Sequence, residues 1–146
     1  MTSHLGLIDY GMGNLHSVQQ AFRRLSRPIE IVKEPNDLKN CHALILPGVG
    51  AFDPAMEHLK RTELIPYIKA WTMEEKPLLG ICLGLQLLFE SSNEGSSDGL
   101  GILKGDVQHL PIDKEERIPH MGWSVLKERK GCPLLSENDH SSWMYF

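Results

Sequence analysis

The sequence predicts an α/β fold with a doubly wound, mostly parallel sheet, followed by a β-rich second half. Short apolar runs alternate with amphipathic stretches along the first 90 residues or so, and this alternation is typical of parallel sheets built from βαβ units. A chain of 146 residues has the length of one domain. We therefore expect a single domain over residues 1–146, with a sheet that positions the functional groups.

The first strand is expected at Leu5–Asp9, an apolar run that ends in the turn-prone sequence Gly-Met-Gly-Asn. A helix should follow this turn. Its apolar side chains recur at helical spacing, so they would share one face; they are Leu15, Val18, Phe22 and Leu25.

Two further strands are expected at Ile29–Val32 and Ala43–Leu46. The second is wholly apolar, which indicates burial on both faces of the sheet. Asp53 and Pro54 together predict a helix start, with Asp53 as the N-cap and Pro54 in the first helical position. A further helix should carry an apolar stripe of Leu64, Ile68 and Trp71.

The apolar run Leu78–Cys82 continues directly into a leucine-rich stretch, which predicts a strand joined to a helix by a sharp turn. After this stretch, Ser91–Gly101 is rich in Ser, Asn, Asp and Gly. Short strands are expected beyond it, separated by prolines, and the last of them is the apolar Trp143–Phe146.

Composition and charge narrow the possible functions. The net charge is −4 and the basic residues are scattered, which argues against binding to nucleic acid or to an anionic membrane. No apolar run approaches the length of a membrane span, about 18 residues, so we expect a cytoplasmic protein.

The three cysteines are far apart and odd in number, which argues against disulfides. Cys41 next to His42 has no second ligand pair at suitable spacing, so neither a metal nor another cofactor is expected.

The strongest chemical motif is Gly80-Ile81-Cys82-Leu83-Gly84, which has the glycine-x-nucleophile-x-glycine pattern of a nucleophile elbow. An elbow between a strand and a helix exposes its central side chain at the carboxyl edge of the sheet. The adjoining helix N-terminus favours the thiolate form of Cys82. The alternative reading is a small buried cysteine packed under a glycine-rich turn.

Two other glycine-rich turns follow predicted strands. The backbone amides of Pro47-Gly48-Val49-Gly50 should emerge at the same edge as Cys82, where they could stabilise an oxyanion; the alternative is an ordinary turn. Gly11-x-Gly13 suggests a dinucleotide site, but His16 stands where the third glycine would be. A simple turn or a contact surface is therefore the better interpretation of that segment.

Four motifs in the right order resemble the glutaminase subunits of imidazole glycerol phosphate synthase, within the class I glutamine amidotransferase family. The resemblance spans nearly the whole chain. The elbow is common to class I amidotransferases, whereas the first and last motifs point to this kind of subunit. The motifs are Asp9–Leu15, Leu46–Phe52, Gly80–Phe89 and Pro119–Trp123.

The resemblance implies that Cys82 attacks the side-chain amide of glutamine, forms a thioester and releases ammonia. It places the amides of Val49 and Leu83 in the oxyanion hole. It assigns glutamine binding to Gly50, Gln86 and Glu94. It also implies a heterodimer with a (β/α)₈-barrel cyclase subunit of histidine biosynthesis, which takes up the ammonia, and the interface residues would be Asn14, Met121 and Trp123.

The resemblance places the His and Glu that complete the catalytic triad after Phe146. His120 and His140 do not occupy the triad position. Because triad members act as a unit, residues 1–146 alone are expected to have little glutaminase activity. Two other interpretations stay open from the residues: another thiol hydrolase of the same fold, or a non-catalytic module that docks on a partner.

Overall fold

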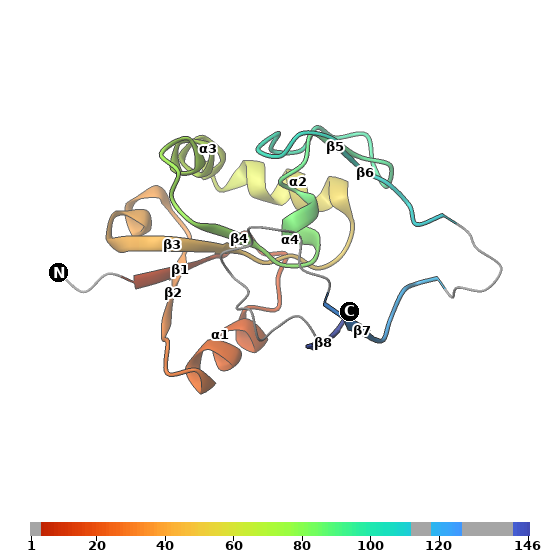
Figure 1. Ribbon diagram of the computed structural model, residues 1–146. Coiled ribbons are helices and arrows are strands. Elements are labelled where there is room, and N and C mark those ends of the chain that lie inside the picture. Colours follow the sequence, from red (N-terminus) through yellow and green to blue (C-terminus); the bar gives the residue numbers. More distant parts are fainter. Residues whose placement is uncertain (1–3, 112–117, 127–141) are drawn as a thin grey trace. The chain divides into compact units, whose positions relative to one another are not determined.

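The computed structural model describes residues 4–111, 118–126 and 142–146 (Figure 1). The chain divides into two compact units, Met1–His109 and Leu110–Phe146. The sequence suggested a single domain, and each unit is described by itself below.

A four-stranded sheet forms the centre of the first unit. Its strands are β1 (His4–Ile8), β2 (Ile29–Val32), β3 (Cys41–Leu46) and β4 (Leu78–Gly80), and their order in the sheet is β2-β1-β3-β4. All three pairings are parallel. Each strand lies within two residues of its predicted bounds, because each is a short stretch rich in apolar or β-branched residues. The predicted parallel sheet is confirmed.

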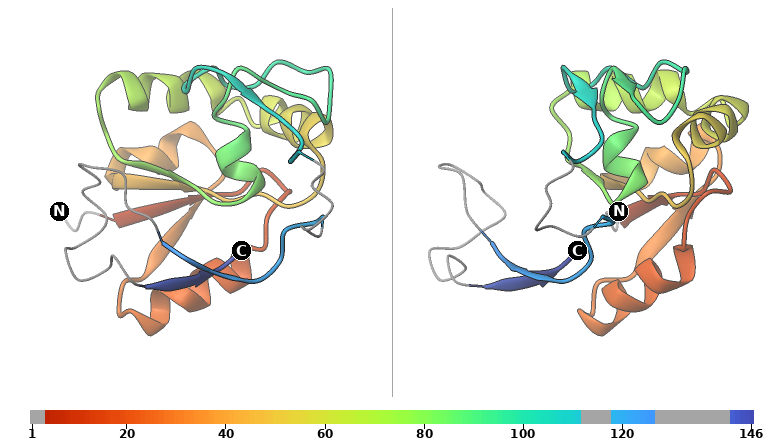
Figure 2. Two further views of the ribbon diagram at one scale, coloured as in Figure 1. Left: turned by 45° about the vertical axis from the view of Figure 1, so that its right-hand side comes forward. Right: turned by 90° about the vertical axis from the view of Figure 1, so that its right-hand side faces the viewer.

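Helices cover both faces of this sheet (Figure 2). The helix α1 (Leu15–Arg24) lies on one face, and α2 (Phe52–Arg61), α3 (Ile65–Met73) and the short α4 (Leu83–Gln86) lie on the other. A 3₁₀ helix, η1 (Pro35–Asn40), joins β2 to β3.

Alternation along β3 divides the core into two parts. Leu44 and Leu46 belong to a large cluster with α2, α3 and α4, and Ile45 belongs to a small cluster with α1. All three side chains are buried, which confirms that this strand is covered on both faces. Burial of this apolar surface is the main stabilising contribution, at roughly 25 cal/mol per Å².

The structure corrects two details of the predicted helices. Leu25 lies just after the last residue of α1 and is 68% exposed, so it does not continue the apolar face. Asp53 is not the N-cap of α2, because that helix already begins at Phe52 after Ala51, and Ala51 makes no side-chain cap. The carboxylate of Asp53 has other partners, described below.

Beyond α4 the described strands are short, as predicted. A parallel pair joins β5 (Ser91–Ser92) to β6 (Asp106–Val107) in the first unit. In the second unit an antiparallel pair joins β7 (Trp123–Val125) to β8 (Trp143–Tyr145). Among the residues described, no helix is long and apolar enough to cross a membrane.

Candidate active site

Three loops leave the sheet at the carboxyl ends of β1, β3 and β4, and hydrogen bonds join them. The buried hydroxyl of Tyr10, after β1, donates to the carbonyl of Pro47, after β3, at 2.8 Å. The amide of Val49 donates to the carbonyl of Met12 at 3.1 Å, and the amide of Ile81 donates to the carbonyl of Leu46 at 3.0 Å. The carboxyl edge of the sheet therefore forms one connected surface, as expected for α/β sites.

Cys82 lies at the turn between β4 and α4 with φ +55° and ψ −121°, a backbone conformation that few residues other than glycine adopt. Its side chain is exposed. A strained strand-to-helix turn with an exposed central residue is the geometry of a nucleophile elbow. The alternative of a buried structural cysteine is therefore wrong for Cys82.

The flanking glycines allow close packing at the elbow, Gly84 against strand β3 and Gly80 against helix α4. A Cβ atom on Gly84 would lie 1.9 Å from the carbonyl oxygen of Leu46, and one on Gly80 would lie 2.6 Å from the Cα of Leu85. The positive φ of the turn falls on Cys82 itself. These glycines are thus required by close approach of the backbone.

The loop after β3 lies directly against the elbow. A Cβ atom on Gly48 would lie 2.5 Å from the amide nitrogen of Gly84 and 2.8 Å from the Cβ of Leu83. Leu83 is the first residue of α4, where amides have no partner within the helix. The amide of Val49 is in a different state, because it already donates to Met12. To bind an oxyanion, the Val49 amide must exchange this carbonyl for the new acceptor.

Tyr10 is a neighbour of Cys82 that the sequence did not single out. It is 4% exposed, and its pKa is raised to about 12 by burial and, to a smaller degree, by the negative charge of the Cys82 thiolate. Its phenol therefore stays protonated and donates to Pro47 at neutral pH. The partner is 37 residues away in sequence, and no local pattern identifies such a contact.

The three predicted glutamine-binding residues lie on three segments of the first unit. Gly50 follows β3 with φ +96°, Gln86 is half-buried at the end of α4, and Glu94 is exposed in the loop after β5. The amide of Glu94 donates to the hydroxyl of Ser92 at 3.2 Å.

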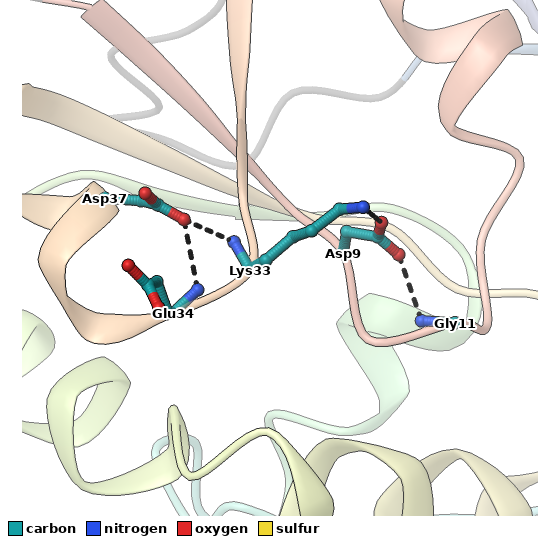
Figure 3. A network of polar contacts seen from close by, with 5 residues as sticks. All are labelled: Asp9, Gly11, Lys33, Glu34 and Asp37. Carbon is teal, nitrogen blue, oxygen red and sulfur yellow. Dashed lines mark hydrogen bonds and ion pairs between the residues drawn. The ribbon is translucent and has the colours of Figure 1, made fainter.

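A polar network supports the loop after β1 (Figure 3). Asp9 accepts a hydrogen bond from the amide of Gly11 at 3.1 Å and pairs with the ammonium of Lys33 at 3.5 Å. Asp37 accepts from the amides of Lys33 and Glu34, at 2.8 and 3.1 Å, and these bonds hold its pKa below the usual range. The ion pair between Lys33 and Asp9 is the contact of this network that joins the end of β1 to the end of β2.

Asn14 caps α1: its side-chain oxygen accepts from the amide of Ser17 at 3.1 Å. The residue is exposed. Its local role is thus helix capping, and the interface role implied by the resemblance is a separate expectation.

The remaining predicted residues belong to the second unit. Met121 and Trp123 are 69% and 66% exposed, and Trp123 packs edge-to-face on Tyr145 across the β7–β8 pair, with 5.6 Å between ring centroids. His120 contacts Ser124 and the ring of Phe146. His140 and Cys132 lie outside the described residues.

Among the residues that the structure describes, no group of three or more His, Cys, Asp or Glu side chains is arranged to hold a metal ion. Cys41, the other cysteine in that part of the chain, is half-buried, and its thiol donates to the carbonyl of Asp37 at 3.4 Å.

Comparison with known proteins agrees with this geometry. Residues 6–145 match the family model described as glutamine amidotransferase class-I. The chain belongs to the class I glutamine amidotransferases. Two of the four motifs that carry the resemblance, the elbow of Cys82 and the glycine-rich loop after β3, lie next to each other at the carboxyl edge of the sheet.

Several relatives are similar over the full length of the chain. The imidazole glycerol phosphate synthase subunit HisH of Prochlorococcus marinus (strain MIT 9211) is 67% identical over all 146 residues, which cover 69% of that protein. Subunit HisH 2 of Prochlorococcus marinus (strain MIT 9313) is 64% identical over 146 residues, which cover 68% of it. These relatives are thus longer than the present chain.

A solved structure described as a crystal structure of glutamine amidotransferase aligns with 82% of this chain at a TM-score of 0.66. The two sequences are 19% identical, and the aligned part covers 62% of that structure's chain. This likeness supports the amidotransferase fold.

Proposed function

We propose that this chain is the glutaminase subunit of an imidazole glycerol phosphate synthase, in which Cys82 releases ammonia from glutamine for a cyclase subunit in histidine biosynthesis. The observation that carries the proposal is the exposed, strained Cys82 at the carboxyl edge of the sheet. The high identity to HisH subunits over the whole chain favours this reaction over that of another thiol hydrolase. As a biosynthetic enzyme it would act in the cytoplasm.

In the proposed reaction, the Cys82 thiolate forms a bond to the side-chain amide carbon of glutamine. The carbonyl electrons move onto oxygen, where the amides of Leu83 and Val49 would stabilise the charge. Loss of one such donor typically lowers kcat by about a hundredfold or more. The carbon–nitrogen bond then breaks, the nitrogen takes up a proton and leaves as ammonia, and water hydrolyses the γ-glutamyl thioester to glutamate.

Binding of glutamine would use Gly50, Gln86 and Glu94. The carboxylate of Glu94 suits the α-ammonium group of the substrate, since charge-assisted hydrogen bonds of this kind are the stronger ones. Asn14, Met121 and Trp123 would contact the cyclase subunit. The high exposure of Met121 and Trp123 supports this, because large apolar side chains at the surface are frequent at protein interfaces.

The proton transfers need a base. By resemblance, this base is a His, oriented by a Glu, in the part of the relatives' chains that these 146 residues do not cover. We propose that rapid turnover needs that part, and that residues 1–146 alone bind glutamine but hydrolyse it slowly. Experiments on turnover should therefore join this chain to the remaining segment of a close relative.

The decisive experiment compares two nitrogen sources. In the joined protein, paired with the cyclase subunit, Cys82→Ala should abolish product formation with glutamine and leave product formation with added ammonium salts unchanged. The matched control is Cys41→Ala, which should retain both reactions. If Cys82→Ala keeps glutamine-dependent turnover, the nucleophile assignment is wrong. If the unsubstituted protein and Cys82→Ala both form product only with ammonium, the chain acts as a docking module.

A further inference from the structure

Asp53 lies in the first turn of α2, three residues after Gly50, and its carboxylate binds a distant loop. The amide of Ser96 donates to both carboxylate oxygens, at 3.1 and 3.0 Å, and the hydroxyl of Ser96 donates at 3.3 Å. The amide of Ser97 donates at 2.9 Å. One side chain thus receives two backbone amides and one hydroxyl from a loop 43 residues further along the chain.

The loop that Asp53 holds is the one that carries Glu94. Its backbone approaches the carboxylate so closely that a Cβ atom on Gly95 would lie 2.1 Å from an Asp53 oxygen. The loop is also closed at its base, where the amide of Gly99 donates to the carbonyl of Glu90 at 2.8 Å. Hydrogen bonds therefore hold the loop on both sides of Glu94: between Glu90 and Gly99 at its base, and from Ser96 and Ser97 to Asp53 further along.

Charge strengthens this contact. The amides of Ser96 and Ser97 hold the pKa of Asp53 below its usual range, so the side chain is ionised at neutral pH. Hydrogen bonds to an ionised acceptor are stronger than neutral ones. The first turn of α2 also favours a negative charge at this position.

We propose that Asp53 is a positioning residue for glutamine, because it ties the loop of Glu94 to the start of the helix that follows Gly50. This inference rests on the proposed function, which assigns glutamine binding to both of these segments. Asp53 itself would not contact the substrate. It keeps the two segments at a fixed separation, so that the amino-acid end of glutamine meets Glu94 while its side-chain amide meets Cys82.

The test is the selective modification of Cys82 in the 146-residue chain. One reagent is a chloroketone analogue of glutamine, which must bind before it alkylates, and the other is iodoacetamide, which needs only an accessible thiolate. Asp53→Ala should slow alkylation by the analogue about tenfold, as expected for loss of hydrogen bonds to a charged group. Alkylation by iodoacetamide should stay within about twofold of wild type.

Three variants sharpen the result. Gly95→Ala should reproduce the selective loss, because its new methyl group would displace the Asp53 carboxylate. Asp53→Asn should be intermediate, since an amide oxygen is a weaker acceptor. Ser96→Ala is the matched control: it removes only the hydroxyl, keeps both backbone amides on Asp53, and should remain close to wild type with either reagent.

Two outcomes would overturn the inference about Asp53. The analogue could alkylate Asp53→Ala as fast as wild type, or both reagents could slow equally, which would indicate a general loss of structure. A different outcome would overturn the proposed function itself, and with it this role of Asp53: wild-type Cys82 would react with iodoacetamide but not with the glutamine analogue, and glutamine would give no protection.

Discussion

The two described cysteines lie at opposite ends of neighbouring strands, and they differ in exposure, hydrogen bonding and backbone conformation. Cys41 begins β3 at the amino edge, where it is half-buried, donates to Asp37, and has a pKa raised by burial and by the negative charges of Glu30 and Asp37. Cys82 follows β4 at the carboxyl edge, where it is exposed on a strained turn. A free thiol becomes a candidate nucleophile through its backbone position, and the residue type alone does not distinguish the two.

The largest effect should come from two glycines, Gly84 in the elbow and Gly6 in the middle of β1. Gly84→Ala places a methyl group against the backbone carbonyl of Leu46 at 1.9 Å, whereas Gly6→Ala meets only side-chain atoms, at 2.8 Å or more. We expect Gly84→Ala to lower the free energy of unfolding by about 3 kcal/mol or more, and Gly6→Ala by about 1–2 kcal/mol. Urea denaturation measures both. Equal losses would contradict the close backbone packing of the elbow.

The next effect concerns Tyr10, which joins two of the loops. Its pKa of about 12 in the folded chain exceeds the value of about 10 in an unfolded one. The folded state therefore keeps the proton longer, and stability is lost as the pH rises from about 10 to 12.

We expect Tyr10→Phe to remove this loss, which amounts to about 2 kcal/mol, and to cost about 1 kcal/mol at neutral pH through the missing hydrogen bond to Pro47. Urea titrations of wild type and variant at neutral and alkaline pH measure the difference. Parallel pH profiles for the two proteins would refute the assigned burial of Tyr10.

A smaller effect tests the strain at Cys82. Glycine accepts φ +55° without steric cost, so Cys82→Gly should be more stable than Cys82→Ala by about 1 kcal/mol. The same pair of substitutions at Cys41, whose φ is −84°, should give the opposite order, because glycine there only adds flexibility to the unfolded chain. Thermal and urea unfolding of the four variants would show whether the sign reverses between the two edges.

The smallest effect is expected for the ion pair between Lys33 and Asp9. Lys33 is 71% exposed, and exposed pairs contribute little after solvent screening. Lys33→Met should change the free energy of unfolding by less than about 0.5 kcal/mol. A loss above about 1 kcal/mol would mean that the network in Figure 3 fixes the loop after β1 more strongly than its exposure indicates.

Much of the fold could be predicted because its signals are local. The β-branched stretch of β2, the apolar run of β3 and the elbow motif each span only a few residues. The contacts that join the site were not predictable in this way: Tyr10 binds Pro47 37 residues away, and Asp53 binds Ser96 43 residues away. The error at Asp53 has the same origin, because the Asp-Pro pair is typical of a helix start while its actual partners are remote.

The most direct test of Cys82 as the glutamine-directed nucleophile is site-resolved alkylation of the wild-type chain by the glutamine chloroketone, followed by mass spectrometry of the peptides that contain Cys41 and Cys82. We expect one adduct, on Cys82, and we expect excess glutamine to suppress it. An adduct on Cys41 at a comparable rate, or labelling of Cys82 that glutamine does not slow, would contradict the assignment of Cys82 as the glutamine-directed nucleophile.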